Sequence, residues 1–147
     1  MRILVDADAC PVTDIAIKIA RENNIEIILY YDDSHITEKE YAKIIIVSQG
    51  PDAVDYALIN DIKASDLAIT QDYGVASMAL AKGAYAINQN GMRYTKDNID
   101  YLLMNRAITK KALKGSKAHI KGPKKRTLED DKRFMYELNK LIGEILW

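Results

Sequence analysis

Short hydrophobic runs alternate with longer amphipathic stretches over the first 88 residues of the chain. The runs are rich in β-branched residues and end in polar ones, which is typical of strands. They cover residues 2–6, 25–31, 43–48, 66–70 and 84–88. Because their hydrophobicity is nearly continuous, we expect these strands to be buried on both faces, as in a parallel sheet.

The stretches between these runs carry hydrophobic residues at helical spacing. They predict helices over residues 11–24, 51–62 and 73–83. Strand and helix therefore take turns along the chain, and this order is typical of parallel βαβ units.

After residue 88 the pattern predicts only helices. Thr95 can cap a helix over residues 96–108, and Thr127 with Asp130 resembles a capping box ahead of a final helix that ends at residue 146. The glycine-bearing, strongly cationic segment 110–126 between them predicts a loop. We expect one domain over residues 1–147: a three-layer α/β/α sandwich with a mainly parallel, Rossmann-like sheet of about five strands and C-terminal helices.

Acidic residues follow the ends of several predicted strands. In an open parallel sheet, ligands bind beyond the carboxyl ends of the strands, near the point where the strand order reverses. We therefore expect these carboxylates to meet at one edge of the sheet; they are Asp6 and Asp8 after the first strand, Asp52 and Asp55 after the third, and Asp72 after the fourth. Grouped carboxylates repel one another, and oxygen ligands suit a hard cation, so the set predicts a site for Mg²⁺ or Mn²⁺.

A structural role for the same acids remains open. Asp52 and Asp55 oppose the dipole of the helix that they begin, and Asp8 can cap the helix near Pro11. Asp32 and Asp33, which follow the second predicted strand, show that acids can follow a strand here merely because strand ends are polar.

The net charge of zero conceals an asymmetry along the chain. Residues 1–105 carry a net charge of −7 and residues 106–147 a net charge of +7. An acidic body with a basic C-terminal part fits a protein that binds cations at one place and a polyanion at another, although a solvated helical face fits the count equally well.

Composition excludes several classes of chemistry. A single cysteine, Cys10, rules out an internal disulfide, and two well-separated histidines cannot form a Cys/His zinc cluster. Cys10 has no nearby histidine or phosphate-loop arginine, so we expect a buried, unreactive thiol. No signal-peptide core and no membrane-length apolar run occurs, which indicates a cytoplasmic protein without membrane contact.

Five segments together resemble the YaiI/YqxD family, and they cover nearly the whole chain. They are VDADACPV (5–12), QGPDAVDYALI (49–59), DLAITQDYGVASMALAKGA (66–84), GMRYTKDNID (91–100) and GPKKRTLEDDKRF (122–134). The family is grouped with PIN-like domains, and the middle section is similar to the NYN branch of those ribonucleases.

The resemblance implies a PIN-like fold whose acidic pocket binds Mg²⁺ or Mn²⁺ and cuts RNA. The metal ligands it implies are Asp6, Asp52 and Asp72, with Asp8 and Asp55 as further catalytic candidates that position water. We expect the basic segment to hold the RNA backbone without reading its sequence, through Lys121, Lys124, Lys125 and Arg126.

Two other functions are compatible with the sequence. PIN nucleases usually have a fourth acid that we cannot assign here, which favours a non-catalytic domain that binds RNA or the ribosome. Alternatively, Asp6 and Asp8 match the Asp-x-Asp pair of haloacid-dehalogenase-like phosphatases, in which the first aspartate attacks the phosphate. The sequence leaves open whether the chain forms a homo-oligomer.

Overall fold

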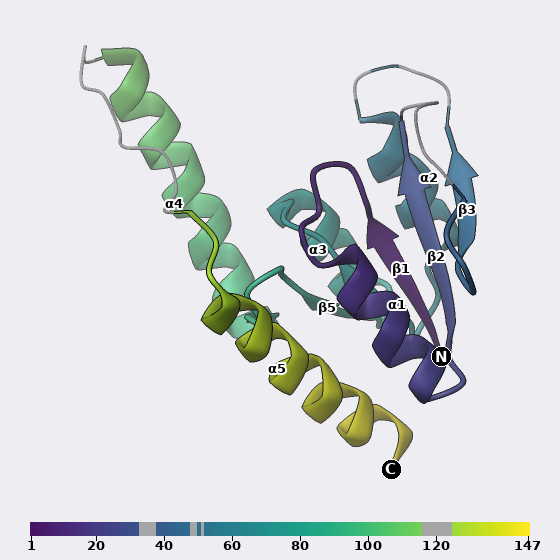
Figure 1. Cartoon of the computed structure of the whole chain (residues 1–147). Helices are drawn as coiled ribbons and strands as arrows, with labels where there is room; N and C mark the ends of the chain where they lie inside the picture. The colour runs from purple at the N-terminus through teal and green to yellow at the C-terminus, as the bar shows by residue number, and fades with distance from the viewer. Residues whose placement is uncertain (33–37, 48–49, 51, 116–124) are drawn as a thin grey trace.

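A six-stranded sheet forms the centre of the protein in the computed structural model, which describes residues 1–32, 38–47, 50, 52–115 and 125–147. The strands are β1 (Arg2–Asp6), β2 (Glu26–Tyr31), β3 (Lys43–Ile46), β4 (Leu67–Ile69), β5 (Tyr85–Ile87) and β6 (Arg93–Tyr94). Their order is β3-β2-β1-β4-β5-β6. Figure 1 shows β3, β2 and β1 side by side. The first five strands pair in parallel, as the hydrophobic pattern predicts.

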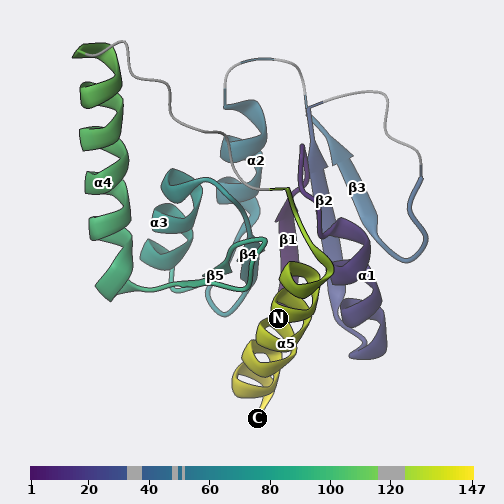
Figure 2. The ribbon, with the colours of Figure 1, turned by 60° about the vertical axis from the view of Figure 1, so that its left-hand side comes forward.

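Five helices accompany the sheet in the described part of the chain. They are α1 (Thr13–Glu22), α2 (Ala53–Asp61), α3 (Tyr73–Ala81), α4 (Lys96–Gly115) and α5 (Leu128–Leu146). Figure 2 shows α4 along the outer side of α3, whereas α1 and α5 lie together near the N-terminus. None of the helices in the described part of the chain combines the length and the hydrophobicity needed to cross a membrane.

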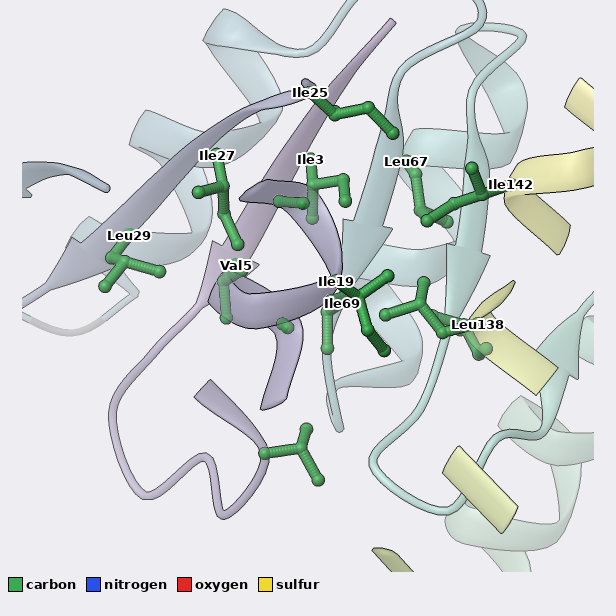
Figure 3. Close-up of a cluster of buried hydrophobic side chains, with 14 of the residues drawn as sticks. Ile3, Val5, Ile19, Ile25, Ile27, Leu29, Leu67, Ile69, Leu138 and Ile142 are labelled. Atoms are coloured by element: carbon green, nitrogen blue, oxygen red, sulfur yellow. The ribbon is translucent and has the colours of Figure 1, made fainter. Parts of the chain in front are cut away.

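Two hydrophobic clusters hold the layers together, one on each face of the sheet. Alternate residues of the central strands, including Ile3 and Val5, pack against α1 and α5 (Figure 3). Leu4 and Ala68 face the other way and pack against α2 and α3. The three-layer α/β/α sandwich predicted from the sequence is therefore confirmed.

Two elements differ from the prediction. β6 is antiparallel to β5 and has only two residues, which is too short to give a hydrophobic pattern. The turn before it is held by the side chain of Asn88, which accepts hydrogen bonds from the amides of Asn90 and Met92 at 2.9 Å.

The second difference is at the predicted basic loop. α4 continues to Gly115, so residues 110–115 of that loop are helical, because lysine, alanine and leucine are good helix formers. The rest of the loop up to Lys124 lies outside the described residues.

A partly buried ion pair joins the starts of the two central strands. The Arg2 guanidinium lies 2.7 Å from Asp66, and the backbone amides of Arg2 and Lys63 donate to the same carboxylate. Burial alone would raise the pKa of Asp66, but these hydrogen bonds and the charge of Arg2 lower it below its ordinary value. The charged carboxylate therefore stabilises the fold above the ordinary pKa of an aspartate.

We expect Asp66→Asn to lower the free energy of unfolding by roughly 1–3 kcal/mol at pH 7, because it leaves the partly exposed guanidinium of Arg2 without its charged partner. The wild-type protein should lose this difference as the pH falls through the lowered pKa of Asp66, below about pH 4. Urea unfolding between pH 3 and 7 measures both effects. Asp100→Asn, which removes an exposed acid, is the control; an equal loss in both variants would contradict the assignment.

Candidate functional site

The site lies where the order of the strands reverses. β1 is flanked by β2 on one side and by β4 on the other, and the chain leaves β1 toward α1 but leaves β4 toward α3, on the opposite face. Such a divergence opens a crevice at the carboxyl ends of the two strands. Asp6 is the last residue of β1, and Asp72 follows β4 as the N-cap of α3.

Thr70 connects these two aspartates. Its buried hydroxyl donates to Oδ2 of Asp6 at 3.0 Å and accepts from the backbone amide of Asp72 at 3.0 Å. The carbonyl of Thr70 in turn accepts from the hydroxyl of Tyr94 at 3.1 Å. Thr70, which follows β4, and Tyr94 of β6 thus hold the carboxylate of Asp6 and the backbone of Asp72 in place.

Asp72 has a structural role as well. Its Oδ1 accepts from the amides of Gly74 at 2.7 Å and Val75 at 3.1 Å, which is a helix N-cap. Within the described part of the chain, no hydrogen bond reaches its Oδ2. A Cβ at residue 74 would lie 3.1 Å from Oδ1, so glycine leaves room for the carboxylate.

Asp52 and Asp55 come from the start of α2, as predicted. Asp52 is exposed and is the N-cap residue, in the left-handed conformation (φ 61°), and its side chain makes no cap hydrogen bond. Asp55 is half-buried in the first turn. Burial raises the pKa of Asp55 to about 6, and the negative charges of Asp72, Asp6 and Asp52 add to the increase.

The pKa of Asp6 is raised as well. Burial is the largest cause that raises the pKa of its carboxyl. The hydrogen bond from Thr70 lowers the pKa, whereas the negative charges of Asp72 and Asp8 raise it further. The negative charge of Asp72 therefore raises the pKa of both Asp6 and Asp55.

Asp8 lies in the same hollow as Asp6. The N-cap of α1 is Val12, so Asp8 is not the residue that caps this helix. Its Oδ2 accepts from the backbone amide of Asp32 at 2.9 Å, which joins the turn after β1 to the end of β2.

Two adjoining hollows contain all five predicted acids. One, of about 330 Å³, is lined by Asp6, Asp8 and Asp72; the other, of about 550 Å³, is lined by Asp52, Asp55 and Asp72. Because Asp72 and Arg106 line both hollows, we treat them as one acidic groove. Asp6 and Asp52 lie in different parts of it, and Asp55 is the acid of α2 that is coupled to Asp6.

Two basic residues of the groove, Arg106 and Lys110, are not among those predicted from the sequence. Arg106 and Lys110 project from α4 and line the groove beside the acids. Their spacing of four residues puts them on one face of a helix, and this signal was available in the sequence. What was not available is the direction of α4, which places that face over the groove.

The predicted RNA-binding residues have different surroundings. Lys125 is exposed and lines a neighbouring hollow that shares Ala9 and Gln71 with the groove. Arg126 instead holds the structure together: its guanidinium donates to Asp131, to the side chain of Asn90 and to the carbonyl of Gln89, at 2.7–2.9 Å. Lys121 and Lys124 lie outside the described residues.

Neither a preassembled metal centre nor an activated thiol is found among the described residues. Within residues 1–32, 38–47, 50, 52–115 and 125–147, no three Asp, Glu, His or Cys side chains are arranged as a metal site. The metal ligand set of Asp6, Asp52 and Asp72 therefore stays a prediction. Burial raises the pKa of the Cys10 thiol, which agrees with an unreactive cysteine.

Comparisons with known proteins find relatives along the whole chain. The model of the family described as Uncharacterized BCR, YaiI/YqxD family matches residues 4–144. A UPF0178 protein of Clostridium acetobutylicum is 54% identical, over 97% of each chain. UPF0178 proteins of Lachnoclostridium phytofermentans and Clostridium tetani are 48% and 47% identical, over 99% and 98% of each chain. No solved structure matches.

We expect Thr70→Val to raise the pKa of Asp6 further, because the hydroxyl is the group that lowers it. The variant also leaves Oδ2 of Asp6 and the amide of Asp72 without a partner, which should cost about 1–3 kcal/mol of stability. Carboxyl-detected NMR titration measures the pKa. Thr70→Ser keeps the hydroxyl and should restore the wild-type value; an unchanged pKa in Thr70→Val would contradict the network.

A raised pKa makes a charged carboxylate costly to the fold, so we expect Asp55→Asn to stabilise the metal-free protein above pH 6. The advantage should shrink as the pH falls through the pKa of Asp55, because the wild-type carboxyl is then protonated. Thermal unfolding at pH 8, 6 and 4 tests this, with Asp100→Asn as the control for losing one negative charge. A destabilised Asp55→Asn at pH 8 would show that the acid is not under repulsion.

Proposed function

The chain belongs to the YaiI/YqxD family, and we propose that it is a PIN-like, metal-dependent ribonuclease that hydrolyses RNA phosphodiester bonds in the acidic groove. One observation carries this proposal: carboxylates from three separate segments share a groove in which burial and mutual repulsion raise the pKa of Asp6 and Asp55. Burial and repulsion of these charges cost the fold stability, and perturbed carboxylates in a cleft are typical of functional sites. A cytoplasmic location is part of the proposal.

The chemistry of these residues fits Mg²⁺ or Mn²⁺. All five acids offer oxygen ligands, which hard divalent cations prefer, and a cation would offset their repulsion. Asp6 ends β1 and Asp72 follows β4, and the capping hydrogen bonds of Asp72 use Oδ1, which supports these two residues as metal ligands. When bound, the cation lowers the pKa of a coordinated water and offsets charge on the leaving oxygen.

The remaining acids have distinct roles in this proposal. Asp55, with its pKa of about 6, can accept a proton near neutral pH, which suits a general base. Asp8 lines the hollow that holds Asp6, where it can orient water. Asp52 lies at the outer part of the groove, where it can complete the ligand set.

Cationic side chains beside the groove supply the contacts for a polyanion. Arg106 and Lys110 of α4 line the groove, and Lys125 lines the adjoining hollow. Phosphate contacts of this kind position a nucleic acid strand without reading its sequence. That the polyanion is RNA follows from the resemblance to PIN-like ribonucleases.

We expect Asp6→Asn to reduce Mn²⁺-dependent cleavage of single-stranded RNA at least about 100-fold, while the far-UV circular dichroism spectrum stays unchanged. A loss of this size is typical when a group that stabilises the transition state is removed. Gel analysis of a labelled oligoribonucleotide measures it. Asp97→Asn, on the outer face of α4, is the matched control and should cleave at the wild-type rate.

Three other results of these assays would distinguish between the candidate functions. Equal cleavage by Asp6→Asn and wild type would contradict the mechanism. Salt-sensitive RNA binding without cleavage in Mg²⁺ or Mn²⁺ would support the non-catalytic RNA-binding alternative. Trapping of beryllium fluoride at Asp6 would support the phosphatase alternative.

A further inference from the structure

α4 has two hydrophobic faces, and within the described part of the chain only one of them packs against other elements. Ile99 is buried, and Leu102 and Leu103 are half-buried, in the cluster that includes α3. Arg106 and Lys110 continue this face toward the C-terminal end of the helix, where they line the groove. The inner face of α4 is therefore fully used by the core and by the site.

The opposite face carries a row of exposed hydrophobic side chains. Tyr101, Met104 and Ile108 are 65%, 63% and 59% exposed. Their spacing of three and four residues is that of the a and d positions of a coiled coil, so they form one seam along the helix. The outer position of α4 in Figure 2 leaves this seam uncovered by the described elements.

Charges at the two ends of the seam have opposite signs. Asp97 and Asp100 lie at its N-terminal end, and Lys111 lies at its C-terminal end; all three are exposed. Asp97 and Lys111 are each seven residues from Met104, so both lie on the seam and Met104 lies midway between them. The outer face of α4 is thus complementary to itself when it is turned end for end.

We propose that two copies of the chain associate through this face, with their α4 helices antiparallel and a two-fold axis near Met104. This arrangement places Asp97 of one copy beside Lys111 of the other, at both ends of the interface. It also sets the helix dipoles in opposite directions, whereas a parallel pair would put like charges together. The interface does not depend on the proposed ribonuclease activity.

The interface is short, which limits its affinity. Residues 97–111 span about 21 Å of helix, so the buried area falls toward the low end of stable protein interfaces. The dimer should therefore dissociate at low protein concentration, with a Kd in roughly the micromolar range. Since Arg106 and Lys110 lie on the inner face, both acidic grooves stay open in the dimer.

Sedimentation velocity across about 1–500 μM of full-length protein tests the association. We expect a reversible monomer–dimer equilibrium in the wild type and at least about a tenfold weaker one in Met104→Glu, because a central apolar contact becomes a pair of like charges. Tyr136→Glu replaces an equally exposed hydrophobic residue on α5 and should dimerise like the wild type. A wild-type monomer at the highest concentration, or a dimer that Met104→Glu leaves intact, would overturn the proposal.

Charge reversal tests the orientation of the helices. Asp97→Lys and Lys111→Asp should each weaken the dimer, whereas the double variant should restore it, because the opposite charges face each other again. A double variant weaker than both single ones would exclude the antiparallel arrangement. The protein could instead stay monomeric, with Lys111→Asp weakening its binding to a single-stranded oligoribonucleotide. In that case the outer face of α4 binds nucleic acid and the dimer proposal is wrong.

Discussion

Repulsion among carboxylates at the carboxyl end of the parallel sheet is the constraint that shapes the candidate site. β1 and β4 are neighbours whose following helices lie on opposite faces, so the chain cannot cover the carboxyl ends of both strands. Acidic side chains occupy this crevice, where burial and neighbouring negative charges raise the pKa of Asp6 and Asp55. Burial and repulsion of these carboxylates lower the stability of the folded protein. Because the chain keeps them together at this cost, we infer that the groove has a function.

The rest of the fold fixes these carboxylates in place. At the amino end of the sheet, the ion pair of Arg2 with Asp66 joins the starts of β1 and β4. The parallel register of these strands, with Val5 opposite Ile69, then brings Asp6 next to Thr70. The ion pair at one end of the two strands therefore supports the geometry of the site at the other.

Most of the fold was predictable because it follows from local patterns. Five short hydrophobic runs and the helices between them determine a parallel sheet, and a parallel sheet brings acids after different strands to one edge. The capping box of Thr127 and Asp130 is likewise local and is confirmed. β6 could not be predicted, because two residues held by the Asn88 turn leave no periodic signal.

Details of the site depend on tertiary contacts that the sequence does not display. An arginine side chain is well suited to bind phosphate, but the guanidinium of Arg126 donates hydrogen bonds to Asp131, Asn90 and Gln89. Arg106 enters the groove only because α4 runs along α3. The coupling of Asp55 to Asp6 depends on the start of α2, which begins with Asp52 in a left-handed conformation.

Crystals soaked in Mn²⁺ and measured at the manganese absorption edge test the central claim most directly. We predict an anomalous peak in the acidic groove, with carboxylate oxygens of Asp6 and Asp72 at about 2.2 Å from it. If crystals soaked in saturating Mn²⁺ show no anomalous peak between Asp6 and Asp72, the grouped carboxylates do not bind a divalent cation.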